Sequence, residues 1–430
     1  MPRSLDDWLD YIETIHPSSW ELGLGRIGAV ADRLELRKPA ATSVIVAGTN
    51  GKGSTCVCLE QALMASGLTV GCTLSPHVHV FNERVRINGV ELDDAALCTA
   101  FEVIEAGRGD TLLTYFEFTS LAALYCFKQA GVDVAVLEIG LGGRLDAFNI
   151  VDGDIAVITN IGIDHTDWLG DTRELIGAEK AGVMRPGQQV MLGPDMPASV
   201  LEPATRLAGI CMRIGRDIEH RDNPDGGWRL HLHGRTLDDL PRGRFPVVNC
   251  ALALAAADAI HPIDATAARA AIDRAWMPGR CEEIAARGRL WVVDVAHNPL
   301  GAGYLRRELP RRYPDARITA VLGTLADKDA EGVVAALDDI VERWILVDAP
   351  PPRGLTAPAL AQRLGRPELS VAGSVPSGLQ EAGSLTQPGD VILVFGSFAT
   401  AEAARLELTK SGDTVESTEF PQGRRAVRSS

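Results

Sequence analysis

The sequence predicts an α/β protein, with a P-loop-containing, doubly wound N-terminal domain and a smaller Rossmann-like α/β domain after it. The main observation is an alternation: short runs rich in Val and Ile end in Gly, Asn, Asp or Pro, and most are followed by stretches with apolar residues at helical spacing. This alternation is typical of a parallel sheet joined by crossover helices. The rhythm stops after about residue 185 and begins again after residue 280, which indicates two domains.

Apolar runs and helical spacing define the elements of the first half. Four runs predict strands, at Ser43–Ala47, Val70–Leu74, Val134–Ile139 and Ile155–Asn160. Three stretches without an internal proline predict helices, at Thr55–Ala65, Asp94–Glu105 and Phe118–Gln129. We therefore expect a doubly wound sheet in this half.

The region from about Arg185 to Phe245 has a different pattern. It contains Pro-Gly and Gly-Gly turns, and polar and apolar residues alternate from Trp228 to Gly234. These features favour small antiparallel strands over crossover units. An Ala-rich helix is expected from Asn249 to about His261.

The strand and helix rhythm then resumes in the last third of the chain. Strands are predicted at Leu290–Val295, Ile318–Leu322, Trp344–Val347 and Val391–Phe395. With a boundary near residues 281–288, we expect a P-loop domain at 1–280 and an α/β domain at 289–412. The polar residues 413–430 are expected to form a mobile tail.

The composition excludes several classes of protein. The 430 residues are 46% hydrophobic and carry a net charge of -15, so nonspecific binding to nucleic acid or to an anionic membrane is not expected. Eight cysteines are too few for a disulfide framework over this length. No run of about 18 uncharged apolar residues is present, and no cationic start leads into an apolar stretch. We expect a cytoplasmic monomer with small-molecule substrates.

A glycine-rich segment around one lysine, at Gly48–Thr55, leads from a predicted strand into a predicted helix. Backbone N–H groups exposed by such glycines, together with the positive end of the helix, bind phosphate, and Lys52 adds a positive charge. The spacing is not that of a strict Walker A motif, which needs glycine at Val46 and Ser or Thr at Gly53. The alternative is an ordinary strand-to-helix turn, although three glycines and a lysine have little purely structural use there.

A second glycine pattern, Gly23-x-Gly25-x-x-Gly28, has the spacing of a dinucleotide fingerprint. It follows His16-Pro-Ser-Ser-Trp-Glu-Leu22, which is not a strand. Because that fingerprint requires a preceding strand, we reject this interpretation.

The remaining motifs follow one another in the order of one known family. They are Ser75–His77, Thr114–Glu117, Glu138–Ala147, Asp164–Gly170, Glu179–Gly182, Pro278–Arg280 and Asp294–Pro299. Together with the phosphate loop, they make the chain resemble the bifunctional dihydrofolate synthase/folylpolyglutamate synthase family, within the ligase superfamily that includes the muramoyl amino-acid ligases. The resemblance runs from Trp8 to Phe398. It implies a ligase that uses ATP and Mg²⁺ to join L-glutamate to dihydropteroate and to tetrahydrofolate.

The chemistry of such a ligase agrees with the motifs. A carboxylate becomes reactive toward an amine in water only after its oxygen has become a leaving group, which ATP achieves by forming an acyl phosphate. Negative charge then gathers along the reaction path, so the site needs a divalent cation and basic side chains close together. The phosphate loop supplies a basic side chain, and scattered acidic residues supply ligands for the cation.

The resemblance implies a metal site at Ser75, Glu138 and His165, with Lys52, Glu138, His165 and Lys180 as catalytic residues. Glu138 ends an apolar strand, where open parallel sheets place their active sites, although a salt-bridged structural acid is the alternative. His165 lies between Asp164 and Asp167, which could orient its ring, although a lone histidine is more often structural. Histidines 77 and 79 are interpreted as loop residues rather than as a zinc pair.

Lys180 shares a helical stripe with Ile176 and Val183, where a charged amine would be costly to bury. The resemblance implies that this lysine is carbamylated. Burial favours the neutral amine that reacts with carbon dioxide. A lysine that extends its ammonium to solvent is the alternative.

The resemblance also implies the nucleotide and pterin contacts. The nucleotide residues are Thr49, Asn50, Gly51, Lys52, Asn249, Arg280 and Asp294, which lie on both sides of the expected boundary, so we expect ATP in a cleft that closes. Arg280 could instead be a solvated linker residue. The pterin residues are Glu21, Leu22, Gly23, Leu24, Thr114, Tyr115, Phe116, Glu117, Leu145, Asp146 and Ala147.

Two positions depart from the family pattern and bear on the substrate. Phe148 replaces the usual threonine, and Ala399 stands where histidine is common. Phe116 could stack on a flat heterocycle, although an aromatic residue at helical spacing is more often part of a core.

Rival functions remain open at this stage. Within the ligases the rival is a monofunctional folylpolyglutamate synthase, and a muramoyl ligase fits the pterin segments less well. From other classes, a dinucleotide oxidoreductase and a P-loop regulatory ATPase are alternatives.

Overall fold

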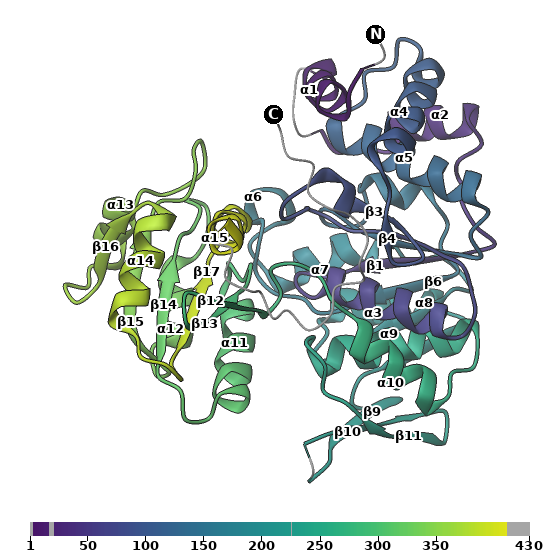
Figure 1. Cartoon of the computed structure of the whole chain (residues 1–430). Coiled ribbons are helices and arrows are strands. Elements are labelled where there is room, and N and C mark those ends of the chain that lie inside the picture. Colours follow the sequence, from purple (N-terminus) through teal and green to yellow (C-terminus); the bar gives the residue numbers. More distant parts are fainter. Residues whose placement is uncertain (1–2, 17–20, 225, 411–430) are drawn as a thin grey trace. The chain divides into compact units, whose positions relative to one another are not determined.

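The computed structural model describes residues 3–16, 21–224 and 226–410 and divides the chain into two compact units, Met1–Met277 and Pro278–Ser430. The first unit is built on an eight-stranded sheet, visible in Figure 1, with the strand order β4-β3-β2-β5-β1-β6-β7-β8. Six neighbouring strands are parallel, and β3 and β4 add an antiparallel edge. The bounds are β1 Thr42–Ala47, β2 Val70–Thr73, β3 Val85–Ile87, β4 Val90–Glu91, β5 Val134–Glu138, β6 Ile155–Ile158, β7 Gln189–Leu192 and β8 Ile210–Arg213.

Helices cover both faces of this sheet, which makes the unit doubly wound. The bounds are α1 Leu5–Ile15, α2 Gly25–Arg33, α3 Lys52–Ala65, α4 Asp94–Arg108, α5 Tyr115–Ala130, α6 Thr166–Leu169, α7 Arg173–Ala181, α8 Ala198–Leu207, α9 Val247–Ile260 and α10 Ala265–Arg274. Short 3₁₀ turns lie at Phe81–Arg84 and Ala147–Ile150.

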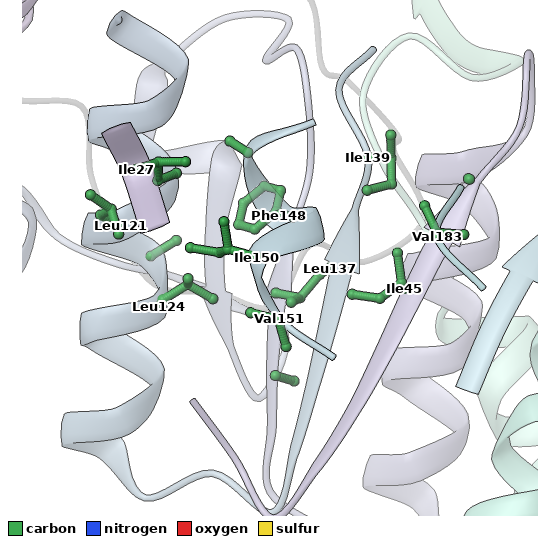
Figure 2. Packing of buried hydrophobic residues seen from close by; sticks show 14 of the residues in the cluster. Ile27, Ile45, Leu121, Leu124, Leu137, Ile139, Phe148, Ile150, Val151 and Val183 are labelled. Carbon is green, nitrogen blue, oxygen red and sulfur yellow. The ribbon is translucent and has the colours of Figure 1, made fainter. Parts of the chain in front are cut away.

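The alternation of residues along each strand explains the two faces. In β1, Ile45 points to the core formed with α1, α2, α4, α5, α7 and α8, whereas Val44 and Val46 belong to the core formed with α3, α9 and α10. Because both faces are buried, the parallel strands read as continuous apolar runs. Figure 2 shows the first core, in which Ile45 and Leu137 of the strands belong to the same cluster as Phe148 and Leu121.

The prediction for residues 185–245 was wrong in its first part. β7 and β8 are parallel members of the large sheet, and α8 joins them as a crossover helix. Each strand has only four residues, and β8 is half exposed at the sheet edge, so neither gives a long apolar run. The second part does form an antiparallel sheet, of β9 Ile218–Asp222, β10 Trp228–Leu232 and β11 Arg235–Leu240.

The second unit has a six-stranded sheet in the order β12-β13-β17-β14-β15-β16, parallel except for β12. Its strands are β12 Glu282–Ala286, β13 Arg289–Val293, β14 Ile318–Leu322, β15 Val341–Val347, β16 Ser370–Gly373 and β17 Val391–Phe395. Its helices are α11 Pro299–Arg312, α12 Ala330–Leu337, α13 Ala357–Leu364, α14 Val375–Leu385 and α15 Phe398–Lys410. Residues 281–288, where a domain boundary was expected, thus form the edge strand β12 and the turn after it. The expected tail at 413–430 lies outside the described residues.

None of the helices in the described ranges combines the length and the hydropathy that crossing a bilayer requires.

Candidate active site

The phosphate loop lies between β1 and α3, at the carboxyl edge of the large sheet. α3 begins at Lys52, three residues earlier than predicted, after Gly51 in the left-handed conformation with φ of 82°. Gly51 has no side chain with which to cap the helix, so the N–H groups of the first turn are suited to an anionic ligand. A larger residue would not fit at this position, because a Cβ at Gly51 would lie 2.5 Å from Nδ2 of Asn249.

The end of β6 holds the phosphate loop in place. The backbone N–H of Asn50 donates to Oδ1 of Asn160 at 3.0 Å, and the carbonyl of Asn50 accepts from the hydroxyl of Thr159 at 2.6 Å. The hydroxyl of Thr49 bonds to the backbone of Gly162. Thr159 and Asn160 were not singled out in the sequence, although their place directly after a buried strand could have identified them.

Two lysines from different helices meet at one carbonyl of the loop. Nζ of Lys52 donates to the carbonyl of Gly48 at 3.2 Å, and Nζ of Lys180 donates to the same oxygen at 3.0 Å. Lys180 is buried on α7 beside Ile176, as the helical stripe predicted. Burial lowers the pKa of Lys180 to about 7, the charge of Lys52 lowers it further, and Asp164 and Asp146 oppose the shift. The site therefore holds an amine that is partly neutral near neutral pH.

Ser75 and Glu138 lie together, whereas His165 lies in an exposed loop. Oε2 of the buried Glu138 accepts the backbone N–H of Ser75 at 2.8 Å. Among the residues that the structure describes, the buried hydroxyl oxygen of Ser75 has no hydrogen-bond partner. His165 is exposed in the loop after β6, with a left-handed φ of 51°, and its N–H donates to Asp164. Its role as a third ligand stays a prediction.

No cluster of three or more His, Cys, Asp or Glu side chains suited to a metal ion is found in the part of the chain that the structure describes. The predicted ligand set contains a serine and so differs from such a cluster.

The predicted pterin residue Asp146 organises the loop after β5. Its Oδ2 accepts the N–H groups of Gly140 and Leu141 at 2.9 and 3.0 Å, and its Oδ1 accepts that of Phe148 at 3.0 Å. Burial raises the pKa of Asp146 to about 6, although these three bonds and the charge of Lys52 act in the opposite direction. Its neighbour Leu145 is half-buried and Ala147 is buried.

The predicted segment Thr114–Glu117 forms the first turn of α5 and places an aromatic ring beside the same loop. Thr114 and Glu117 form a capping box, in which Oε2 of Glu117 accepts the N–H of Thr114 at 2.8 Å. The Phe116 ring packs edge-on against Phe148, with centroids 5.8 Å apart. A Cβ at Gly140 would lie 2.6 Å from Cζ of Phe116, so only glycine permits this approach. Phe116 is partly buried.

Arg84 is a half-buried cation beside Tyr115 that the sequence did not indicate. Its Nε donates to Nδ1 of His77 at 2.8 Å, and its guanidinium lies 5.7 Å from the centroid of Tyr115. Burial lowers the pKa of Arg84. Burial and the charge of Arg84 also lower the pKa of His77 to about 4, so this histidine is neutral and accepts the hydrogen bond from Arg84.

The second unit holds the predicted nucleotide residues Arg280 and Asp294. Asp294 is buried directly after β13 and accepts the N–H groups of Cys281 and Ala296 at 2.8 and 2.7 Å. Burial raises its pKa, and the charge of Arg280 opposes this. The guanidinium of Arg280 lies 5.1 Å from the ring centroid of Phe398. In the first unit, Asn249 of α9 donates to the hydroxyl of Ser54 at 2.9 Å.

Comparison with known proteins identifies the family. Residues 46–189 match the family described as Mur ligase middle domain, and residues 279–398 match the Mur ligase, glutamate ligase domain. The chain is 43% identical to the dihydrofolate synthase/folylpolyglutamate synthase of Escherichia coli K12 over 400 residues, which cover 92% of this chain and 93% of the relative. The chain belongs to the dihydrofolate synthase/folylpolyglutamate synthase family.

Solved structures of this family agree with the fold. E. coli FolC in complex with DHPP and ADP has a TM-score of 0.90 and 41% identity, covering 95% of this chain and 98% of that one. The bifunctional folylpolyglutamate synthase/dihydrofolate synthase of Yersinia pestis, complexed with AMPPNP and Mn ion, has a TM-score of 0.89 and 43% identity, with the same coverage. The predicted fold class, a doubly wound P-loop domain followed by a second α/β domain, is confirmed.

Two positions at which the sequence departs from the expected dihydrofolate synthase/folylpolyglutamate synthase pattern have clear places in the structure. Phe148 is buried, and its ring packs edge-on against the ring of Phe116. Ala399 lies in the first turn of α15, next to Phe398, whose ring centroid is 6.2 Å from that of His297. The glycine pattern at 23–28 is not a dinucleotide loop, because residues 21–24 form no strand and α2 already begins at Gly25.

Proposed function

We propose that this chain is an ATP-dependent, ADP-forming ligase that joins L-glutamate to dihydropteroate, giving dihydrofolate, and adds further glutamates to tetrahydrofolate. The E. coli relative carries the name of both activities, and the solved relatives contain ADP with DHPP, or AMPPNP with Mn. ATP and a divalent cation are therefore used by this chain. The observation that carries the proposal is the meeting of Lys52 and Lys180 at the carbonyl of Gly48, within a family match that spans nearly the whole chain.

The charge of Lys52 suits a phosphoryl group at the loop. Lys52 extends from the first turn of α3 beside the N–H groups of the glycine loop. Such an arrangement stabilises negative charge that develops on phosphate oxygens without any rearrangement during the reaction. An acceptor carboxylate would attack the terminal phosphorus of ATP and form an acyl phosphate, with ADP as the leaving group. The amine of glutamate would then displace phosphate and lose a proton, leaving the amide.

Ser75 and Glu138 fit a magnesium ion. The unpartnered hydroxyl oxygen of Ser75 and the carboxylate of Glu138 are adjacent oxygen donors, the type that Mg²⁺ prefers. His165 is proposed as a further ligand. A bound Mg²⁺ would neutralise charge on the phosphate oxygens. Glu138 lies close to the phosphate loop, since a Cβ at Gly53 would be 3.5 Å from its Oε2.

Lys180 is proposed to act as its carbamate. The neutral amine attacks carbon dioxide: a C–N bond forms as one C=O π bond opens, and the nitrogen loses one proton, so the neutral side chain becomes an anionic carbamate. The lowered pKa of Lys180, caused by burial, supplies the neutral amine. The carbamate of Lys180 would orient the ligands of the cation, or it would hold the side chain of Lys52 in place.

The pterin site is proposed to include residues 21–24, the first turn of α5 and residues 145–147. The partly buried Phe116 ring, packed against the buried Phe148, lies beside the loop that follows Glu138. Such a ring suits contact with a flat heterocycle. The incoming glutamate is proposed to bind to the second unit, which matches the glutamate ligase domain.

The test incubates the protein with ATP, Mg²⁺ and labelled glutamate, together with either dihydropteroate or tetrahydrofolate. Label in the products of both acceptors and ADP in equal amount are expected. Label with tetrahydrofolate alone would leave a monofunctional folylpolyglutamate synthase. Phosphate release that ignores glutamate would instead indicate a P-loop ATPase without ligase activity.

A further inference from the structure

Arg26, in the first turn of α2, connects two of the proposed pterin segments. One amino group of its guanidinium donates to the carbonyl of Glu21 at 2.8 Å and to Oε1 of Glu117 at 3.2 Å. The other amino group donates to Oε1 of Glu21. One side chain from α2 thus binds both the segment at 21–24 and the first turn of α5, which is 91 residues away in sequence.

Glu117, which accepts one of these hydrogen bonds, is buried and therefore needs Arg26 as a partner. The side chain of Glu117 is only 5% exposed, so its carboxylate needs partners for both oxygens. Oε2 accepts the N–H of Thr114 within the capping box, and Oε1 faces Arg26. The Arg26 side chain is 25% exposed, and its Nε is buried without a partner. Removing Arg26 would leave the charge of Glu117 buried without its cation, which destabilises the local arrangement.

The same turn of α5 carries the aromatic ring of the proposed pterin site. Phe116 precedes Glu117 directly and contacts Gly140, two residues after Glu138. It also packs against Phe148. A displacement of Glu117 would therefore move the Phe116 ring relative to the loop after β5. Arg26 consequently fixes the position of the 21–24 segment relative to this ring.

We propose that Arg26 is a positioning residue for the pterin-containing acceptor. It sets the spacing between residues 21–24 and Phe116, and thereby the affinity for dihydropteroate and tetrahydrofolate, with no contribution to ATP binding. This inference depends on the proposed function. The three acceptor atoms require the planar fork of arginine, because a lysine ammonium is a single point charge that cannot span them in the same way.

The test measures equilibrium binding of dihydropteroate and of Mg·ADP to the full-length protein, and the KM values in the glutamate-labelling assay. For Arg26→Ala we expect at least a tenfold weaker dihydropteroate Kd and a raised KM for both acceptors, with the Kd for Mg·ADP within twofold. For Arg26→Lys we expect a smaller rise, since its charge still pairs with Glu117. Arg33→Ala is the matched control: Arg33 ends the same helix, is exposed, and donates to Thr111. It should bind both ligands like the wild type.

The outcomes separate this inference from the proposed function. If the wild type binds dihydropteroate and transfers glutamate while Arg26→Ala binds dihydropteroate within twofold, the positioning role is refuted and the ligase function stands. Equal weakening of Mg·ADP binding would also refute it, because that result indicates general damage. A wild type that does not bind dihydropteroate would overturn both. If Arg26→Ala does not fold, Glu21→Ala removes the side-chain half of the segment's connection and leaves Arg26 on Glu117 and on the backbone carbonyl of residue 21; an unchanged dihydropteroate Kd would then refute the role.

Discussion

At the scale of single residues, the site combines a lysine whose pKa is lowered by burial with a buried carboxylate. Lys180 is buried beside a second lysine and donates to the carbonyl of Gly48, and the buried Glu138 accepts the N–H of Ser75. Burying each of these side chains costs stability, which their hydrogen bonds offset in part. Variants at these two positions should therefore affect activity more than folding.

Glu138→Gln should reduce kcat by at least about 100-fold, because it removes the charge that faces the cation while keeping the volume of the side chain. The amide can still accept the N–H of Ser75, so the melting temperature should stay close to that of the wild type. Steady-state kinetics and a thermal melt check the two expectations. Activity within a fewfold of the wild type would remove Glu138 from the proposed metal site.

Lys180 gives a prediction for pH. Because the folded state lowers the pKa of Lys180 to about 7 from the ordinary 10.5, the unfolded chain binds the extra proton over the pH range between these two values. The cost of burying this group is therefore complete below about pH 7 and is relieved as pH rises from about 7 towards 10.5. In urea unfolding from pH 6 to 9, the free energy of unfolding of the wild type minus that of Lys180→Met should stay level below about pH 7 and become more positive above it.

Carbamylation of Lys180 gives a separate expectation for activity. Removing dissolved carbon dioxide at about pH 8 should lower kcat of the wild type, and added bicarbonate should restore it. Lys180→Met should be inactive with and without bicarbonate. A wild type whose kcat ignores carbon dioxide would contradict the carbamate, although not the placement of Lys180 in the site.

At the scale of elements, the phosphate loop depends on close contact with the end of β6. Gly48 has a φ of 148°, and a Cβ at this position would lie 1.9 Å from the hydroxyl of Thr159. That hydroxyl is needed to hold the carbonyl of Asn50. The Cβ and the backbone nitrogen of Thr159 would also lie only 3.1 and 3.2 Å from the added carbon, so rotating the Thr159 side chain does not remove the crowding.

Gly48→Ala should therefore lower the free energy of unfolding by about 1–3 kcal/mol, from backbone strain and overpacking, and should weaken Mg·ATP binding. Chemical denaturation and calorimetry measure these two effects. Gly303→Ala is the control, because a Cβ there meets nothing within 4 Å and the residue lies inside α11. A Gly48→Ala protein that binds Mg·ATP as tightly as the wild type would refute the close-contact argument.

The elements show how far the sequence could be interpreted. Strands β1, β5 and β14 were found because both sheet faces are buried, which leaves continuous apolar runs. The crossover through β7, α8 and β8 was missed because these strands are short and one lies at the edge. Arg26 and Arg84 were missed because neither has a local pattern, and their partners come from distant segments. The residues around Gly48 were found because glycine spacing is local.

At the scale of the whole molecule, the chain consists of two α/β units with separate cores. The first contains the phosphate loop and the proposed cation and pterin residues, and the second contains Arg280 and Asp294. The predicted nucleotide contacts are thus distributed over both units. In each unit, some predicted residues lie at or directly after the carboxyl end of a parallel strand, Glu138 in the first and Asp294 in the second, as open α/β sheets do with their ligands.

The phosphate loop predicts which ligand should stabilise the folded protein. A ligand that binds only the folded chain raises the free energy of unfolding, by about 2.7 kcal/mol when its concentration is 100 times its Kd. Mg·ATP should therefore raise the melting temperature, whereas NAD should not, because the glycine pattern at 23–28 lacks the strand that a dinucleotide loop needs. The stabilisation by ATP should shrink when EDTA removes the cation, since Ser75 and Glu138 then face the phosphates without it. In Glu138→Gln the effect of EDTA should be smaller than in the wild type, because part of the cation site is already lost. Stabilisation by NAD and not by Mg·ATP would contradict the ligase assignment and favour the oxidoreductase alternative.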